Sequence, residues 1–168
     1  MTPLVSIIMG STSDLPVMEK AARQLDELAI PFEILALSAH RTPDEVAQFA
    51  REAEARRVRV IIAGAGMAAH LCGVIASMTP LPVIGVPIKA TLDGMDALLA
   101  IVQMPPGIPV ATVGINGAQN AALLAAQMLS LGDADLMERL KAFKEGLKEK
   151  VVRANADLKE VKYRFKTN

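Results

Sequence analysis

An imidazole, a guanidinium and a hydroxyl occur together in the segment Ser38-Ala39-His40-Arg41-Thr42-Pro43. A histidine suits proton transfer near neutral pH, and an arginine suits the binding of a phosphate. The apolar run 32–37 before it predicts a buried strand. Thr42-Pro43 followed by Glu45 has the form of a capping box with proline at the first helical position. The segment is therefore expected at the carboxyl end of a strand, where parallel α/β sheets bind ligands.

A second polar turn, Gly10-Ser11-Thr12-Ser13-Asp14, follows the apolar run 4–9. Its backbone N–H groups and serine hydroxyls can cradle a phosphate, and Asp14 can accept hydrogen bonds from a sugar diol. An ordinary helix N-cap without a ligand explains this stretch equally well.

A third turn, Gly64-Ala65-Gly66-Met67-Ala68-Ala69-His70, follows the apolar run 58–63. Its glycines allow a planar ligand or a small carboxylate to approach the backbone closely. Taken alone, this glycine pattern is more typical of a tight strand-to-helix turn. The chain has only two histidines, His40 and His70, and both fall at predicted ligand-edge turns. The alternative for each is a structural imidazole satisfied by a nearby hydrogen bond.

The residue pattern argues against a metal site, serine-hydrolase chemistry, a Walker-type ATP site and a disulfide. Two histidines about thirty residues apart, without clustered carboxylates, make a poor metal site. The chain has neither the glycine-flanked serine of the α/β-hydrolases nor a Walker-type ATP loop. Its single cysteine, Cys72, excludes an intrachain disulfide and multi-cysteine metal centres, and is expected to fill a packing site.

The composition is typical of one globular domain spanning residues 1–168. Of the 168 residues, 52% are hydrophobic, and the mean hydropathy is +0.34. The net charge is zero and there is no Trp, which argues against nucleic acid as a partner. The N-terminus has no signal-peptide pattern, and no apolar run is long enough to span a membrane. We expect a soluble, cytoplasmic protein.

Apolar runs alternate with helical patterns along the chain, which predicts an α/β fold with a parallel sheet of about five strands. Because the runs are continuously apolar, helices should cover both faces of the sheet. A flavodoxin-like, three-layer fold with strand order 2-1-3-4-5 is expected. The five predicted strands span 4–9, 32–37, 58–63, 82–86 and 110–115.

The C-terminal half carries two distinctive helical patterns. The helix within 118–131, with Asn116 as its expected cap, is apolar nearly all round, which indicates either a subunit interface or an internal helix covered on several sides. From Ala134 a charged amphipathic helix begins, and the region 134–168 is expected to dock on a neighbouring subunit. The loops 87–94 and 103–109, rich in Pro and Gly, are expected at the functional edge, either as rigid pocket walls or simply as stiff loops.

Four motifs together resemble the N5-carboxyaminoimidazole ribonucleotide mutase family of purine biosynthesis. They are GSTSD (10–14), SAHRTP (38–43), GAGMAAHLCG (64–73) and IVQMPPGIPV (101–110), and the likeness covers residues 4–131. The resemblance implies a homo-octamer with active sites between subunits, a small ribonucleotide substrate, and no ATP, metal or organic cofactor. It also implies the reaction. The carboxylate leaves the exocyclic nitrogen as carbon dioxide, C4 of the ring attacks it, and a histidine moves the proton.

The resemblance also implies a role for individual residues, with His40 as the proton shuttle. Ser38 and the backbone of Gly64, Ala65 and Gly66 would line the carboxylate pocket. Arg41, Ser11 and Ser13 would hold the 5′-phosphate. Asp14 would bind the ribose hydroxyls, and His70 would stand near the base or the migrating carboxylate.

The sequence departs from the family pattern at a few positions. Met67 stands where glycine is frequent, Cys72 where proline is common and Ala97 where serine is common, and the loop 89–92 is one residue short. Two alternatives remain. One is a direct aminoimidazole ribonucleotide carboxylase that uses carbon dioxide, although that branch tends to carry lysine at the position of Arg41. The other is a non-catalytic nucleotide-binding regulatory module on the same scaffold.

Overall fold

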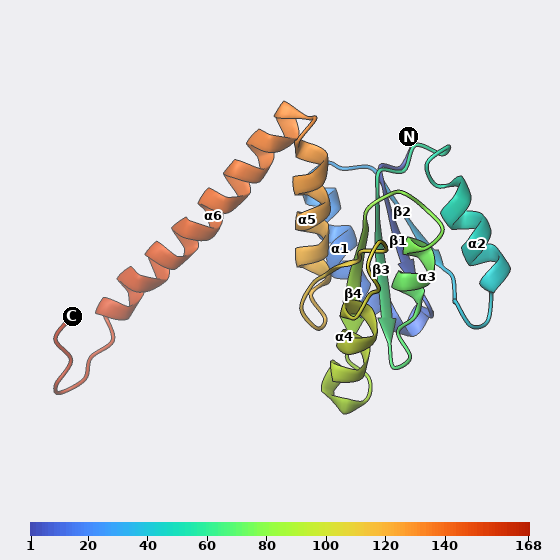
Figure 1. Cartoon of the computed structure of the whole chain (residues 1–168). Helices are drawn as coiled ribbons and strands as arrows, with labels where there is room; N and C mark the ends of the chain where they lie inside the picture. Colours follow the sequence, from blue (N-terminus) through green and yellow to red (C-terminus); the bar gives the residue numbers. More distant parts are fainter.

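The computed structural model describes residues 1–168 as a parallel sheet between two layers of helices, with one long helix projecting from it (Figure 1). The sheet order is β2-β1-β3-β4-β5, so the predicted flavodoxin-like order is confirmed. The strands are β1 (Val5–Met9), β2 (Phe32–Ala36), β3 (Val60–Gly66), β4 (Val83–Ile88) and β5 (Ala111–Thr112). The helices are α1 (Leu15–Glu27), α2 (Pro43–Glu52), α3 (Leu71–Ala76), α4 (Met95–Val102), α5 (Ala118–Ser130) and α6 (Ala134–Lys159).

Two hydrophobic cores hold the layers together. Residues of α1, α5 and the start of α6 pack with one face of the sheet, and residues of α2, α3 and α4 pack with the other face. Every residue of β1 and β4 is buried, which explains why these runs are continuously apolar. No helix is both long and apolar enough to cross a membrane.

The edge strands differ from the prediction. In β2 the side chains are only partly covered, and Ile34 is 42% exposed, because β1 is the only strand beside β2. At the other edge, β5 has two residues instead of the six expected. Beyond Thr112 the chain stays beside β4 through hydrogen bonds from the Val113 N–H to the Gly85 carbonyl at 3.1 Å and from the Asn116 N–H to the Pro87 carbonyl at 2.8 Å. It turns at Asn116, whose φ of 57° lies in the left-handed region.

Two expected side-chain caps are not made. Thr42 is the N-cap residue of α2 and Pro43 is the first helical residue, as predicted, but the Thr42 side chain makes no cap hydrogen bond. Its hydroxyl accepts a hydrogen bond from the Ser38 backbone N–H at 2.9 Å and donates to the Ser38 carbonyl at 3.1 Å. The α5 cap is Gly117, because the Asn116 side chain instead accepts a hydrogen bond from the Lys89 backbone N–H at 3.0 Å. In both cases the side chain braces a loop.

The apolar character of α5 is explained within one chain. This helix packs on α1, on the sheet and on α6, and its alanines Ala121, Ala122, Ala125 and Ala126 are fully buried. The internal-helix alternative therefore accounts for α5, which gives no separate argument for a subunit interface.

The helix predicted from Ala134 is confirmed as α6. Asp133 caps it by accepting a hydrogen bond from the Leu136 N–H at 2.9 Å, and Arg139 Nε donates to the carbonyl of Leu28 at the end of α1. Only Leu136 and Leu140 of α6 are buried. Beyond them the helix extends away from the body of the protein (Figure 1).

Because all five strands are parallel, the loops that follow them converge at the carboxyl-terminal ends of the strands, which we call the carboxyl edge of the sheet. This edge carries the turns after β1, β2, β3 and β4, and three of them are the turns in which the sequence predicts chemistry. The loop 103–109 lies elsewhere. It precedes β5 and therefore lies at the amino-terminal ends of the strands, on the far side of the sheet from these turns. Its expected place in the functional site is wrong.

Gly85, in the middle of β4, provides a test of this packing. A Cβ placed there would overlap the Ile101 side chain of α4 and lie 3.0 Å from Val110. We predict that Gly85→Ala lowers the free energy of unfolding by about 1–3 kcal/mol, because the core must shift to admit a methyl group. Urea denaturation measures this. Gly132→Ala is the matched control, since nothing lies within 4 Å of its Cβ position. Equal stability of the two variants would contradict the packing described here.

Candidate active site

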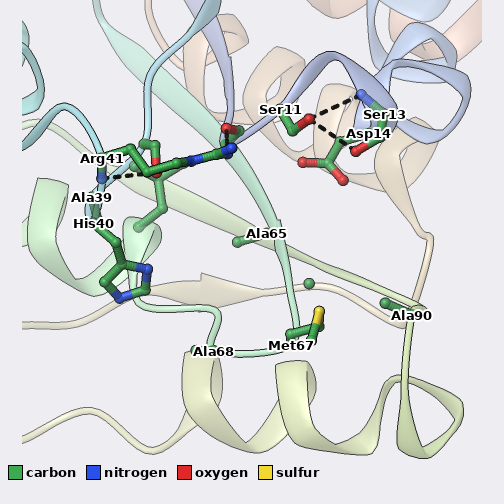
Figure 2. Close-up of a pocket in the computed structure, with 14 residues that line it drawn as sticks. Ser11, Ser13, Asp14, Ala39, His40, Arg41, Ala65, Met67, Ala68 and Ala90 are labelled. Atoms are coloured by element: carbon green, nitrogen blue, oxygen red, sulfur yellow. Dashed lines mark hydrogen bonds between the residues drawn. The ribbon is translucent and has the colours of Figure 1, made fainter.

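A cavity of about 470 Å³ opens at the carboxyl edge of the sheet (Figure 2). This volume lies within the range of small-molecule sites. The turns after β1, β2, β3 and β4 all contribute to its wall. The lining residues are Gly10, Ser11, Ser13, Asp14, Ser38, Ala39, His40, Arg41, Ala65, Gly66, Met67, Ala68, Leu71 and Ala90. Eight of the ten residues in the predicted site are among them.

The two histidines of the chain meet beside this cavity. His40 Nε2 lies 2.8 Å from His70 Nδ1, and the rings are edge-on, with an interplanar angle of 83°. One ring nitrogen must donate and the other accept, so the contact fixes how the two imidazoles share their protons. His70 itself does not line the cavity. The structure therefore gives it a position behind His40.

Arg41 crosses from the turn after β2 to the turn after β1. Its Nη2 donates a hydrogen bond to the Gly10 carbonyl at 2.6 Å, and its Nε donates to the Ser38 hydroxyl at 3.3 Å. These contacts hold the guanidinium at the cavity wall beside Ser11 (Figure 2). A planar cation with N–H groups to spare is well suited to an anionic group of a ligand.

The turn after β1 places two hydroxyls and a carboxylate on the same wall. Ser13 donates hydrogen bonds to the Ser11 hydroxyl oxygen from its backbone N–H at 3.3 Å and from its own hydroxyl at 3.0 Å. Asp14 makes no helix cap hydrogen bond. Partial burial raises the pKa of Asp14 above its ordinary value of 3.8, although a backbone hydrogen bond from Ser11 and the positive charge of Arg41 act in the opposite direction.

The end of β3 and the turn after it form the floor of the cavity. The two glycines here, Gly64 and Gly66, are each required for a different contact. A Cβ on Gly66 would lie 3.0 Å from the Ile88 carbonyl oxygen of β4, so only glycine brings the strand end this close. Gly64 does not line the cavity. It lies within β3, where a Cβ would overlap the thioether of Met18 in α1. Gly64 is therefore a packing residue in this structure, whereas Ala65 and Gly66 reach the cavity as predicted.

Six cavity residues lie outside the ten predicted site residues, namely Gly10, Ala39, Met67, Ala68, Leu71 and Ala90. Five of them are glycine or alanine or carry a buried side chain, and so signal no chemistry. Their places next to predicted strand ends were the only available signal. Ala90 comes from the loop 87–94, so the expectation that this loop walls the pocket is confirmed at that residue.

The remaining groups support acid–base and polar chemistry at this edge. No group of three His, Cys, Asp or Glu residues is arranged to hold a metal ion. Cys72 is fully buried, its thiol donates to the Ala63 carbonyl at 3.2 Å, and burial raises its pKa to about 12, so it fills a packing site as expected. A second cavity of about 580 Å³ at the opposite edge has no ionisable side chain in its wall.

The raised pKa of Asp14 gives a prediction about stability and pH. The folded pKa lies above the unfolded one, so the stability linked to this group is fully present below pH 3.8 and is lost as the pH rises through the folded pKa. Asp14→Asn should therefore raise the melting temperature relative to the parent at pH 7 and not at pH 3. Thermal denaturation at both pH values measures this.

Glu149→Gln on the exposed face of α6 is the control for the Asp14 variant, and its effect on the melting temperature should be small at both pH values. A lower melting temperature of Asp14→Asn at pH 7 would show that the carboxylate stabilises the fold, contrary to this account.

Comparison with known proteins finds relatives whose names all refer to the carboxylation of aminoimidazole ribonucleotide or to its carboxylated forms. The family model described as AIR carboxylase matches residues 4–150. An N5-carboxyaminoimidazole ribonucleotide mutase of Pyrococcus horikoshii is 56% identical over 160 residues, which cover 95% of this chain and 90% of that protein. A phosphoribosylaminoimidazole carboxylase of Schizosaccharomyces pombe is 53% identical over 161 residues, which cover 95% of this chain and 29% of that longer protein.

The fold has a solved relative as well. The crystal structure of Treponema denticola PurE2-S38D matches with a TM-score of 0.86 at 33% sequence identity, over 95% of this chain and 100% of that one. The family match spans most of the chain, including all four of the turns that build the cavity. The chain therefore belongs to the AIR carboxylase family.

Proposed function

We propose that this chain is an ATP-independent mutase that converts N5-carboxyaminoimidazole ribonucleotide to 4-carboxy-5-aminoimidazole ribonucleotide in purine biosynthesis. The observation that carries the proposal is the His40–His70 contact at a cavity that also holds Arg41 and two serine hydroxyls. Relatives of similar length and more than half identical sequence bear the mutase name. The cavity is the place in the fold where a nucleotide and a proton carrier can meet.

The chemistry needs one proton carrier and one enclosed space. When the bond between the exocyclic nitrogen and the carboxylate breaks, carbon dioxide leaves and the nitrogen takes a proton from the His40 imidazolium. C4 of the ring then attacks the carbon dioxide, and His40 removes the C4 proton. His40 gives one proton to the nitrogen and takes one back from C4, so the enzyme is unchanged after one turnover and the reaction requires no cofactor. A closed cavity keeps the carbon dioxide beside C4, which replaces a bimolecular encounter by proximity.

His70 acts on the reaction through His40. A hydrogen bond to one nitrogen of an imidazole selects which tautomer the ring adopts and fixes its orientation. With His70 Nδ1 on His40 Nε2, the Nδ1 atom of His40 is the nitrogen left for the substrate. The hydrogen bond also allows the pair to share the proton between the two chemical steps. We therefore assign His70 as a positioning residue.

The opposite wall of the cavity suits the rest of the nucleotide. The hydroxyls of Ser11 and Ser13 and the guanidinium of Arg41 offer donors to the 5′-phosphate. Asp14 offers acceptors to the ribose hydroxyls. Ser38 and the backbone at 65–66 are then on the side of the heterocycle and its carboxylate. This arrangement supports the substrate-binding roles expected from the family, apart from that of Gly64.

The direct carboxylase is the second candidate, because fungal relatives carry that name. The two candidates differ in the substrate that the enzyme accepts. The mutase turns over the carboxyamino compound at low bicarbonate, whereas the carboxylase requires aminoimidazole ribonucleotide and carbon dioxide. The non-catalytic regulatory module is tested by the variants below, since it requires no proton transfer by His40.

We also propose that the protein acts in the cytoplasm as an octamer with sites between subunits. Apolar side chains on α6 face the solvent in the single chain, among them Leu147, Val151, Val152 and Leu158. On α4, Met95, Leu99 and Val102 share one face and are each about half exposed. Such faces are typical of surfaces that another protein chain covers. Residues 134–168 are then the segment that docks on a neighbour.

His40→Asn tests the proposed function. Asparagine keeps polarity and approximate size but cannot carry the proton, so kcat should fall by about 10²- to 10⁴-fold while KM changes little. Steady-state kinetics with the carboxyamino substrate measures both values. His70→Leu should lower kcat by a smaller factor and alter the pH profile, because the imidazole of His40 remains. Full activity of His40→Asn would refute the assignment.

Light scattering tests the assembly. The mass at assay concentration should be eight times that of the 17.8 kDa chain. Leu147→Asp combined with Val151→Asp should reduce it, because two charges then enter the docking face of α6. Glu149→Gln, on the side of the helix opposite Leu147 and Val151, should leave the mass unchanged. A monomer from the unaltered chain would refute the octamer without affecting the chemistry.

A further inference from the structure

Met67 has a backbone conformation and a side-chain exposure that both disfavour methionine at this position in the folded protein. Its φ of 55° lies in the left-handed region, which suits glycine and disfavours a side chain with Cβ. Its side chain is also 57% exposed, although it is large and apolar. Glycine at this position would remove both the strained side chain and the exposed apolar surface. Packing within the chain therefore gives no reason for methionine.

The surroundings of Met67 show what the side chain faces. It lines the cavity, between Gly66 and Ala68 in the turn after β3 (Figure 2). The other apolar residues in the wall are small alanines and Leu71, which is buried. Met67 is thus the one large apolar side chain that the cavity wall leaves open to a ligand. In Figure 2 it stands on the opposite side from Ser11, Ser13 and Asp14.

This geometry divides the cavity into two walls of different character. The wall with the serines and Asp14 offers polar groups for a phosphate and a sugar. The wall with Met67 offers a flexible, polarisable thioether, which packs well against a flat ring. A left-handed backbone also occurs at Ala29 and Arg57, which do not line the cavity, so the exposed position of the Met67 side chain in the cavity wall carries the argument.

We infer that Met67 is a substrate-contacting residue whose thioether packs on the heterocycle of the bound ribonucleotide and contributes to the preference for a base-bearing ligand. This inference rests on the proposed function and deepens it, since it assigns recognition of the ring to a residue of the turn after β3 to which the resemblance gives no role. It concerns affinity for the ring and assigns no step of proton transfer to Met67.

Three variants separate the contact from the backbone strain. Met67→Leu keeps an apolar side chain of similar volume and the same strain. Met67→Gly and Met67→Asn both suit the left-handed backbone but lack the apolar contact. The turn that begins at Met67 also carries His70, through the hydrogen bonds from the Ala69 N–H to the Met67 carbonyl and from the His70 N–H to the Ala68 carbonyl, both 2.9 Å. Both kcat and ligand affinity must therefore be measured.

The experiment compares two ligands by calorimetry, aminoimidazole ribonucleotide and ribose 5-phosphate. For Met67→Gly and Met67→Asn we expect the Kd of aminoimidazole ribonucleotide to rise about threefold to tenfold, the range of a lost thioether–ring contact. The Kd of ribose 5-phosphate, which has no ring to contact Met67, should stay unchanged. Met67→Leu should bind both ligands nearly as the parent does. The melting temperature of Met67→Gly should equal or exceed that of the parent.

Three results would overturn the inference. One is unchanged affinity of Met67→Gly and Met67→Asn for aminoimidazole ribonucleotide. The second is an equal loss of affinity for both ligands, or a fall in kcat alone, because Met67 would then act through the shape of the turn. The third is a smaller mass of these variants in light scattering, which would place Met67 against another copy of the chain. Failure of the proposed function is distinguishable, because it appears as full activity of His40→Asn.

Discussion

The hydrogen bond between His40 and His70 is the contact on which the site depends. The two histidines follow β2 and β3, and these strands are not neighbours, because β1 lies between them in the sheet. The loops after β2 and β3 must therefore meet over the end of β1, and that end carries Ser11 and Ser13. The strand order 2-1-3 thus brings the two histidines and the serine hydroxyls that we propose as the phosphate site to one point. Ligands of open α/β sheets bind where the direction of strand order reverses, as it does here.

The rest of the structure keeps these loops close. Arg41 links the turn after β2 to the Gly10 carbonyl after β1, and the absence of a side chain at Gly66 lets β3 end against β4. Thr42 and Asn116 brace the loops with their side chains instead of capping helices. Burial of both sheet faces makes the strand ends rigid, and rigid ends hold the side chains of the proposed site in place without a ligand.

Much of this arrangement could be predicted from the sequence because it depends on local patterns. Continuous apolar runs predicted the strands, and polar turns after three of them predicted eight of the residues that line the cavity. The prediction failed where other contacts compete. Thr42 and Asn116 have the residue types of helix caps, but Ser38 in the preceding turn and Lys89 after β4 hold their side chains. Gly64 has the spacing of a binding residue, but the thioether of Met18 occupies the space beside it. Met67 carries no polar group, so only its backbone conformation shows that it is unusual.

The central claim is that His40 moves the proton at C4 of the substrate ring. Hydrogen exchange at that carbon measures this directly. Aminoimidazole ribonucleotide is incubated with the enzyme in D₂O without carbon dioxide, and the C4 proton is followed by NMR. We expect the enzyme to replace this proton by deuterium faster than buffer does, and His40→Asn to give no such acceleration. Exchange by His40→Asn as fast as by the unaltered enzyme, or no acceleration by either, would contradict this claim.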